Sequence, residues 1–114
     1  RWSFIGVRAF GVLTEQDGAA RWLDHGIPAD RALGAEFVQS TTPIPPLEAL
    51  DALYARWRTP HHDGHPPLTG GLVGFIGWEA VRQLENLPNR PPADYAVPGQ
   101  ALSLVSELVA LDHR

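Results

Sequence analysis

The sequence predicts an α+β fold, in which a mainly antiparallel sheet carries one long and one short helix. Three observations support this prediction: a strand pair around Asp17-Gly18, one segment of helical periodicity near residues 46–58, and β-rich segments at 71–77 and 101–113. Strands that precede and follow a single long helix, without regular β-α alternation, favour an antiparallel sheet with helices on one side. The 114 residues, 44% of them hydrophobic, are enough for one compact domain.

The first element is a β-hairpin. Residues 2–14 ("WSFIGVRAFGVLT") are rich in β-branched and aromatic side chains, and "AARWL" follows the pair Asp17-Gly18. An Asp-Gly pair between two such segments is a strong hairpin signal, because glycine accepts the positive φ of a tight turn. The chain is therefore expected to begin with two antiparallel strands.

The long helix is expected in "PPLEALDALYARWRTP", residues 45–60. Pro46 suits the first turn and Pro60 ends the helix. Helical spacing predicts one apolar face formed by Leu47, Leu50, Leu53, Tyr54 and Trp57. The preceding segment, His25 to Pro46, has no periodicity and is expected to be a loop with one short turn around Ala29 to Leu33.

The second half of the chain alternates loops with short elements. A surface loop is expected in "HHDGHPP" (61–67), then a strand in the glycine-rich stretch, and a short helix from about Glu79 to Glu85 with Val81 and Leu84 on one face. The proline-rich stretch from Asn86 to Gln100 is expected to be a loop. Residues 101–113 alternate well enough to form a final strand.

The stretch "TGGLVGFIGWEAVR" (69–82) raises the question of whether its glycines bind a phosphate or allow close packing. A P-loop needs a lysine, and the chain has none. A dinucleotide site needs its glycines at a strand-to-helix turn, whereas these are spread through a strand. We therefore expect Gly74, and Gly71 and Gly77 on the opposite face, to admit another backbone or a bulky side chain, such as Trp22, Trp57 or Phe75.

The charge pattern argues against two classes of partner. The net charge is −4, and the nine basic residues are all arginines that form no cluster, so neither nucleic acid nor an anionic membrane is expected to bind. No apolar run approaches the roughly 20 residues that span a bilayer. The absence of cysteine excludes disulfides and fits a cytoplasmic protein. The chain opens on an arginine rather than a methionine, which suggests a fragment of a longer chain.

Catalytic and metal-ligating patterns are weak. His61, His62 and His65 with Asp63 could in principle hold a metal, but a loop rich in proline and glycine favours a solvated role. Asp112 and His113 are neighbours on a strand, so their side chains point to opposite faces and form no dyad. No nucleophile motif is present, and Glu79 and Glu85 do not form a carboxylate pair. We therefore predict no catalytic residue and no metal site in this chain.

A series of short motifs resembles a known family. The segments "RWSFIG" (1–6), "PPLEAL" (45–50), "LTGGLVGFIGWEAVR" (68–82), "LENLP" (84–88) and "VALDH" (109–113) follow one another as in the N-terminal domain of anthranilate synthase component I. The related aminodeoxychorismate synthase component I shares this pattern. The resemblance implies that residues 1–114 are an incomplete N-terminal domain, part of a larger two-domain α/β sandwich subunit. An upstream segment and the C-terminal chorismate-binding domain would lie outside these residues.

The resemblance also implies a function. The family's enzymes are lyases that convert chorismate and ammonia, the latter supplied by a glutamine amidotransferase subunit, with Mg²⁺ bound in the C-terminal domain. This domain would then have a regulatory and scaffolding role in tryptophan biosynthesis, with feedback inhibition by tryptophan. Two alternatives remain: the same domain of an aminodeoxychorismate synthase or a phenazine-type chorismate aminase, and a stand-alone small binding module.

The resemblance assigns three effector-binding residues. The family's tryptophan pocket uses the start of an "R-[YWF]-S-F" strand, which corresponds to Arg1, Trp2 and Ser3 here, and a "LLES"-type segment upstream that this sequence lacks. A guanidinium can bind a carboxylate through two parallel hydrogen bonds, which makes Arg1 a suitable ligand for an amino acid. The alternative is that Arg1 is simply solvated and Trp2 belongs to the core.

Overall fold

The computed structural model describes residues 1–114 and contains one four-stranded sheet. The elements, in chain order, are β1 (Trp2–Gln16), β2 (Ala19–Asp24), α1 (Ala29–Leu33), α2 (Ala35–Gln39), α3 (Pro46–Trp57), β3 (Gly71–Ile76), the 3₁₀ helix η1 (Trp78–Gln83) and β4 (Gln100–Asp112). The strand order is β2-β1-β4-β3, and every neighbouring pair is antiparallel. The predicted α+β class with an antiparallel sheet is confirmed.

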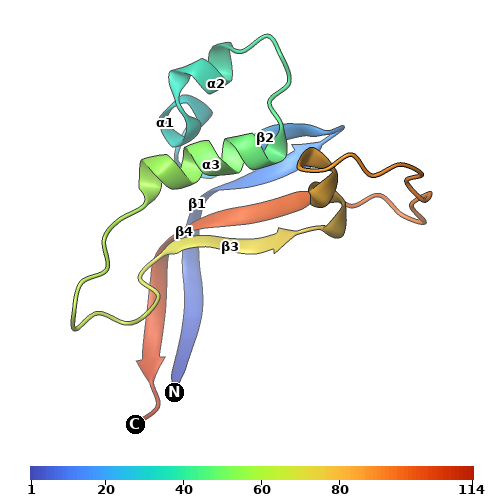
Figure 1. Ribbon diagram of the computed structural model, residues 1–114. Helices are drawn as coiled ribbons and strands as arrows, with labels where there is room; N and C mark the ends of the chain where they lie inside the picture. Colours follow the sequence, from blue (N-terminus) through green and yellow to red (C-terminus); the bar gives the residue numbers. More distant parts are fainter.

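The helices gather at one end of an elongated molecule. Figure 1 shows α1, α2 and α3 above the sheet, whereas β1 and β4 continue past the other strands to a tip that carries both chain ends. The molecule measures 50 × 32 × 22 Å along its principal axes. No helix combines the length and the apolar character that crossing a membrane would require.

The molecule is elongated because the two central strands, β1 and β4, are much longer than their neighbours. β1 has 15 residues and β4 has 13, whereas β2 and β3 have 6 each. β2 pairs only with residues 11–16, and β3 pairs only with residues 100–105. Residues 2–9 of β1 therefore pair only with β4, as a two-stranded ribbon. Register shifts between Gly6 and Val12 interrupt this ladder, as β-bulges do where strands bend.

The predicted hairpin is confirmed. Gln16 pairs with Ala19, so the loop contains only Asp17 and Gly18, with φ angles of 52° and 77°. Positive φ at both central residues is typical of the turns whose twist matches paired strands. The Glu15 carboxylate accepts a hydrogen bond from the Gly18 N–H and reinforces the turn.

The core lies between α3, α1 and the inner face of the sheet. Its buried side chains include Leu13, Leu33, Leu53 and Leu104. Helix α3 buries Pro46, Ala49 and Leu53, while Tyr54 is 60% exposed. The prediction that Tyr54 lies on the buried face was therefore wrong, because the buried face runs through Pro46, Ala49 and Leu53, and Tyr54 is rotated by about 100° from Leu53.

The segment from His25 to Pro46 is more ordered than predicted. The turn at Ala29–Leu33 is helix α1, and a second helix, α2, follows at Ala35–Gln39. Five residues are too few to show a helical period in the sequence, and such short helices depend on tertiary packing. Here Ala32 and Leu33 are buried in the core, which explains how α1 is held.

The short helix near residue 80 is a 3₁₀ helix and starts earlier than predicted. It covers Trp78–Gln83, and Leu84 lies beyond it with 75% of its side chain exposed. The buried residue of this helix is Ala80. Val81 and Leu84 are three residues apart, a spacing that places side chains on one side of a 3₁₀ helix, but Leu84 lies just past the end of this one.

The glycines allow close packing, but only partly with the expected partners. A Cβ on Gly74 would lie 1.9 Å from the carbonyl oxygen of Ala101 on β4, so another backbone occupies this space. Trp22 instead crosses Gly11, where a Cβ would lie 2.2 Å from its ring, and its Nε1 donates a hydrogen bond to the Ile27 carbonyl at 2.7 Å. The prediction that Trp22 packs against a glycine of β3 is therefore wrong.

Candidate functional site

The three residues assigned to effector binding lie together at the tip of the β1–β4 ribbon. The Arg1 guanidinium binds the Asp112 carboxylate through two hydrogen bonds, from Nε to Oδ1 at 2.7 Å and from Nη2 to Oδ2 at 2.6 Å. Arg114 adds a second contact, with its Nε 2.8 Å from Asp112 Oδ2. The antiparallel register, which pairs Trp2 with Asp112, places these groups side by side.

Ser3 has a partner from the other chain end. Its Oγ lies 2.7 Å from His113 Nε2, and the His113 N–H donates to the Arg1 carbonyl at 2.8 Å. Sequence reasoning did not identify Asp112 and His113 as members of this cluster. No local pattern marks them, because only the pairing of the first strand with the last brings residues 110 positions apart into contact.

Trp2 packs within the ribbon rather than in the core. Its ring stacks on Phe4 with 6.2 Å between centroids, and the Arg1 guanidinium carbon lies 5.7 Å from the Trp2 centroid. A cation at this distance from a tryptophan ring is attracted to its face. Trp2 and Phe4 thus form a stacked aromatic pair beside a cation, at the position where the family resemblance implies that tryptophan binds.

Arg1 keeps the capacity to bind a further anion. A guanidinium has five N–H donors, and the Asp112 pair uses one on Nε and one on Nη2. The Arg1 side chain is 52% exposed, so its remaining donors reach solvent. The arrangement can therefore bind a carboxylate without breaking the Arg1–Asp112 pair.

The ion pair between Arg1 and Asp112 lowers the pKa of the Asp112 carboxyl group, which a titration can test. The hydrogen bonds from Arg1 hold the pKa of Asp112 below its ordinary value of 3.8, and the partial desolvation of the carboxylate opposes this shift. Because the folded-state pKa is the lower one, the pair stabilises the fold above the ordinary pKa and loses this contribution as the pH falls through the folded value. An NMR titration of the Asp112 carboxyl carbon is expected to show the lowered pKa, and Arg1→Gln should raise it. An identical titration curve in the variant would contradict this assignment.

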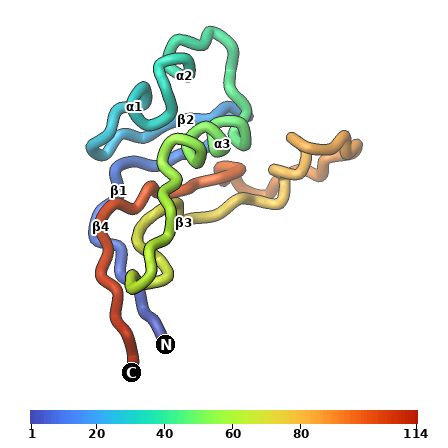
Figure 2. Tube along the Cα trace, turned by 60° about the vertical axis from the view of Figure 1, so that its left-hand side comes forward, coloured from blue at the N-terminus to red at the C-terminus, as the bar shows by residue number.

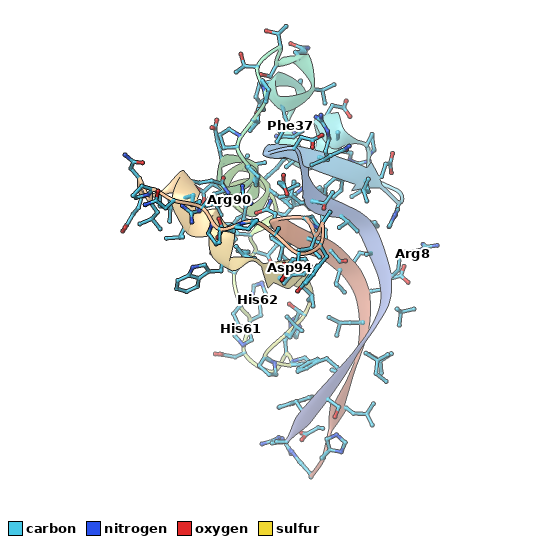
Figure 3. All side chains as sticks on the ribbon, turned by 90° about the vertical axis from the view of Figure 1, so that its right-hand side faces the viewer. Arg8, Phe37, His61, His62, Arg90 and Asp94 are labelled. Carbon is cyan, nitrogen blue, oxygen red and sulfur yellow. The ribbon has the colours of Figure 1, made fainter.

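Other clusters of polar side chains do not assemble a metal site. Figure 3 shows His61 and His62 on the connection between α3 and β3, where the rings of His62 and His65 meet edge to face at 5.9 Å. No three histidine, aspartate or glutamate side chains are arranged to hold a metal ion. Glu79 is bound to Arg82 and Arg90. The residues present therefore do not fit a Mg²⁺ centre.

Curated proteins are similar to this chain along nearly its whole length. It is 39% identical over 116 residues to anthranilate synthase component 1 of Arthrobacter globiformis, a match that covers 99% of this chain and 19% of that protein. The chain is homologous to one segment of anthranilate synthase component 1. The enzyme component of the same name from Mycobacterium tuberculosis is 38% identical over 113 residues, with 99% of this chain and 20% of that protein covered.

The solved structure of anthranilate synthase component I from Streptococcus pneumoniae has the same fold. It superposes with a TM-score of 0.69 over 99% of this chain and 22% of its own length, at 18% identity. This likeness supports the arrangement of strands and helices described above. No protein-family model matches the chain. The chain spans about a fifth of the length of the anthranilate synthase components that it matches.

Proposed function

We propose that these residues are the N-terminal regulatory and scaffolding domain of an anthranilate synthase component 1. The observation that carries the proposal is the 39% identity over 99% of the chain. The parent enzyme would convert chorismate and ammonia to anthranilate in the cytoplasm, as a step of tryptophan biosynthesis. A glutamine amidotransferase subunit would supply the ammonia. The named relatives favour this function over an aminodeoxychorismate synthase or a phenazine-type enzyme.

The catalytic site would lie in another part of the parent chain. No group of three acidic or histidine side chains in this chain is arranged to hold Mg²⁺. Chorismate and Mg²⁺ are therefore proposed to bind a C-terminal domain. The fraction of the relatives that is matched, about a fifth, leaves ample length for such a domain.

The scaffolding role is supported by the outer face of the sheet. The helices cover the inner face, whereas on the other side Leu23, Val73 and Phe75 are each about half exposed, at 50%, 50% and 48%. The strand register places Val12 and Ser103 between Leu23 and Val73 in one cross-strand row. A contiguous apolar surface of this kind marks a contact site. We propose that the C-terminal chorismate-binding domain packs there.

The regulatory role is proposed for Arg1, Trp2 and Ser3. Free donors on Arg1 would bind the carboxylate of tryptophan, and the stacked rings of Trp2 and Phe4 would offer a surface for its indole. The Ser3 hydroxyl would accept a hydrogen bond from the ammonium group. The supporting geometry is that all three residues gather at one end of the ribbon beside Asp112 and His113.

Arg1→Ala is expected to weaken tryptophan inhibition of the intact enzyme by about tenfold or more, because a charge-assisted hydrogen bond to the effector is lost. Uninhibited turnover should stay nearly unchanged. Steady-state inhibition curves with chorismate and glutamine test this. Arg8→Ala is the matched control, since Arg8 lies on strand β1, which Arg1 immediately precedes, and its guanidinium is 3.6 Å from Glu107. Unchanged inhibition in Arg1→Ala would remove this residue from the effector site.

Calorimetric titration of L-tryptophan separates the proposed function from its alternatives. Binding by the intact parent chain is expected, and absence of binding would favour an aminodeoxychorismate-type or phenazine-type enzyme. The same titration of residues 1–114 reports whether the pocket needs the rest of the chain. Binding by the parent alone would mean that the effector contacts both parts.

A further inference from the structure

One cavity lies away from the Arg1 end, between α3, the sheet and the α3–β3 connection. Its volume is about 610 Å³. Figure 2 shows that the chain leaves α3, descends and turns back into β3. Residues of this connection, among them His61 and Thr69, line one side of the cavity. Pockets for small molecules generally measure about 300–1,000 Å³, so the volume suits a one-ring or two-ring compound.

One side of the cavity is apolar and rigid. Phe10, Leu53, Trp57 and Leu104 line it, and Leu53 and Leu104 belong to the buried core. The Trp57 indole is held in place because its Nε1 donates a hydrogen bond to the Ala32 carbonyl at 2.9 Å. A fixed aromatic wall over a packed floor can accept a flat apolar group without rearrangement.

The other side is polar and carries no acid. The chain has 13 acidic residues, yet none of them lines this cavity, whereas Arg58 and His61 do. The Arg58 guanidinium forms no ion pair, unlike those of Arg1, Arg8 and Arg82. Thr59, Thr69 and Ser106 line the same cavity. This combination favours a negatively charged ligand, because the guanidinium lacks a carboxylate partner within the protein.

The backbone at Gly71, on the same cavity, is open as well. Gly70 and Gly71 line the cavity with φ angles of 147° and 133°, a conformation that favours glycine. A Cβ placed on Gly71 would meet no atom within 4 Å. Packing therefore does not explain this glycine, in contrast to Gly74. A ligand can approach the main chain here more closely than at any side-chain-bearing residue.

We propose that this cavity binds a small aromatic carboxylate, with its ring against Trp57 and its carboxylate on Arg58. The site is separate from the proposed effector site. Phe10 lies nine positions after Arg1 along the ribbon, and at about 3.3 Å per position this corresponds to at most roughly 30 Å. The inference goes beyond the proposed function, because it assigns a second ligand site to the same domain.

The test uses 2-naphthoate as the probe and 2-naphthamide as its neutral analogue of the same shape. Both are titrated into the intact parent chain, with binding followed by calorimetry and by NMR of the Gly70, Gly71 and Trp57 N–H signals. Naphthoate is expected to shift these signals and to bind at least about tenfold more tightly than naphthamide. Arg58→Gln should remove this preference. Arg21→Gln is the matched control, since Arg21 is another exposed arginine without an ion pair, on β2 and outside the cavity.

Each alternative result overturns the proposal. Failure of naphthoate to bind would mean that the cavity is closed or filled in the intact chain. Equal affinity for naphthoate and naphthamide would show that no anion is recognised. Equal losses in Arg58→Gln and Arg21→Gln would point to general charge effects rather than to this site. Arg58 is exposed at the end of α3, so its replacement should leave thermal unfolding unchanged, which circular dichroism checks.

Discussion

Gly74→Val is expected to lower the free energy of unfolding by about 3 kcal/mol, the upper part of the range for overpacking. The physical reason is that a Cβ on Gly74 would lie 1.9 Å from the Ala101 carbonyl oxygen and 2.9 Å from its carbon. Both atoms belong to the backbone of β4, so no change of rotamer can relieve the contact. The β3–β4 pairing must shift instead. Urea denaturation measures the change.

Gly6→Val is the matched control for this prediction. Gly6 also lies in a strand, but a Cβ there would be 3.9 Å from Val105, an ordinary van der Waals distance. We expect this variant to unfold within about 0.5 kcal/mol of the original protein, as surface substitutions usually do. Equal stability of the Gly74 and Gly6 variants would show that the close approach at Gly74 does not constrain the sheet.

Leu13→Ala is expected to cost about 3–5 kcal/mol, because it removes a buried side chain and leaves a cavity. Leu13 is completely buried on β1, one of the two central strands, and its neighbours across the sheet are Trp22 on β2 and Leu102 on β4. The hole would therefore open beneath α3, where several elements meet. Thermal and urea unfolding followed by circular dichroism measure the loss.

Leu84→Ala removes the same atoms from a different environment. Leu84 is 75% exposed after the 3₁₀ helix, so its truncation should change the free energy of unfolding by less than about 0.5 kcal/mol. A comparable loss in both variants would mean that Leu84 is covered in solution by a part of the molecule or by another chain. A loss below about 1 kcal/mol in Leu13→Ala would contradict the core assignment of Leu13.

The elements that could be predicted are those whose signal is local and long enough. The hairpin follows from Asp17-Gly18, because the tight turn needs positive φ at two adjacent residues. Helix α3 follows from its periodicity and from the two prolines that bracket it, Pro46 and Pro60. The short helices α1 and α2 and the 3₁₀ helix were misjudged or missed. They contain five or six residues each, too few for a period, and tertiary packing holds them.

The candidate sites show the same division. Arg1, Trp2 and Ser3 were selected by resemblance, and their role in binding tryptophan stays a prediction. Their partners Asp112 and His113 could not be inferred, because no local sequence pattern predicts that the first and last strands pair. The cavity near Arg58 also escaped sequence reasoning. Its lining comes from β1, α3, the connection to β3, and β4, which only the folded chain brings together.

From the order of its residues alone, this protein's α+β class, its hairpin, its long helix and its resemblance to anthranilate synthase component I could be deduced. These depend on interactions between residues close in the chain and on the spacing of short motifs. The tertiary structure decided the strand order, the partners of each glycine and the groups around Arg1. These depend on contacts between segments that are distant in the chain. Trp22, for example, packs over Gly11 on β1, whereas the backbone of Ala101 occupies the space at Gly74.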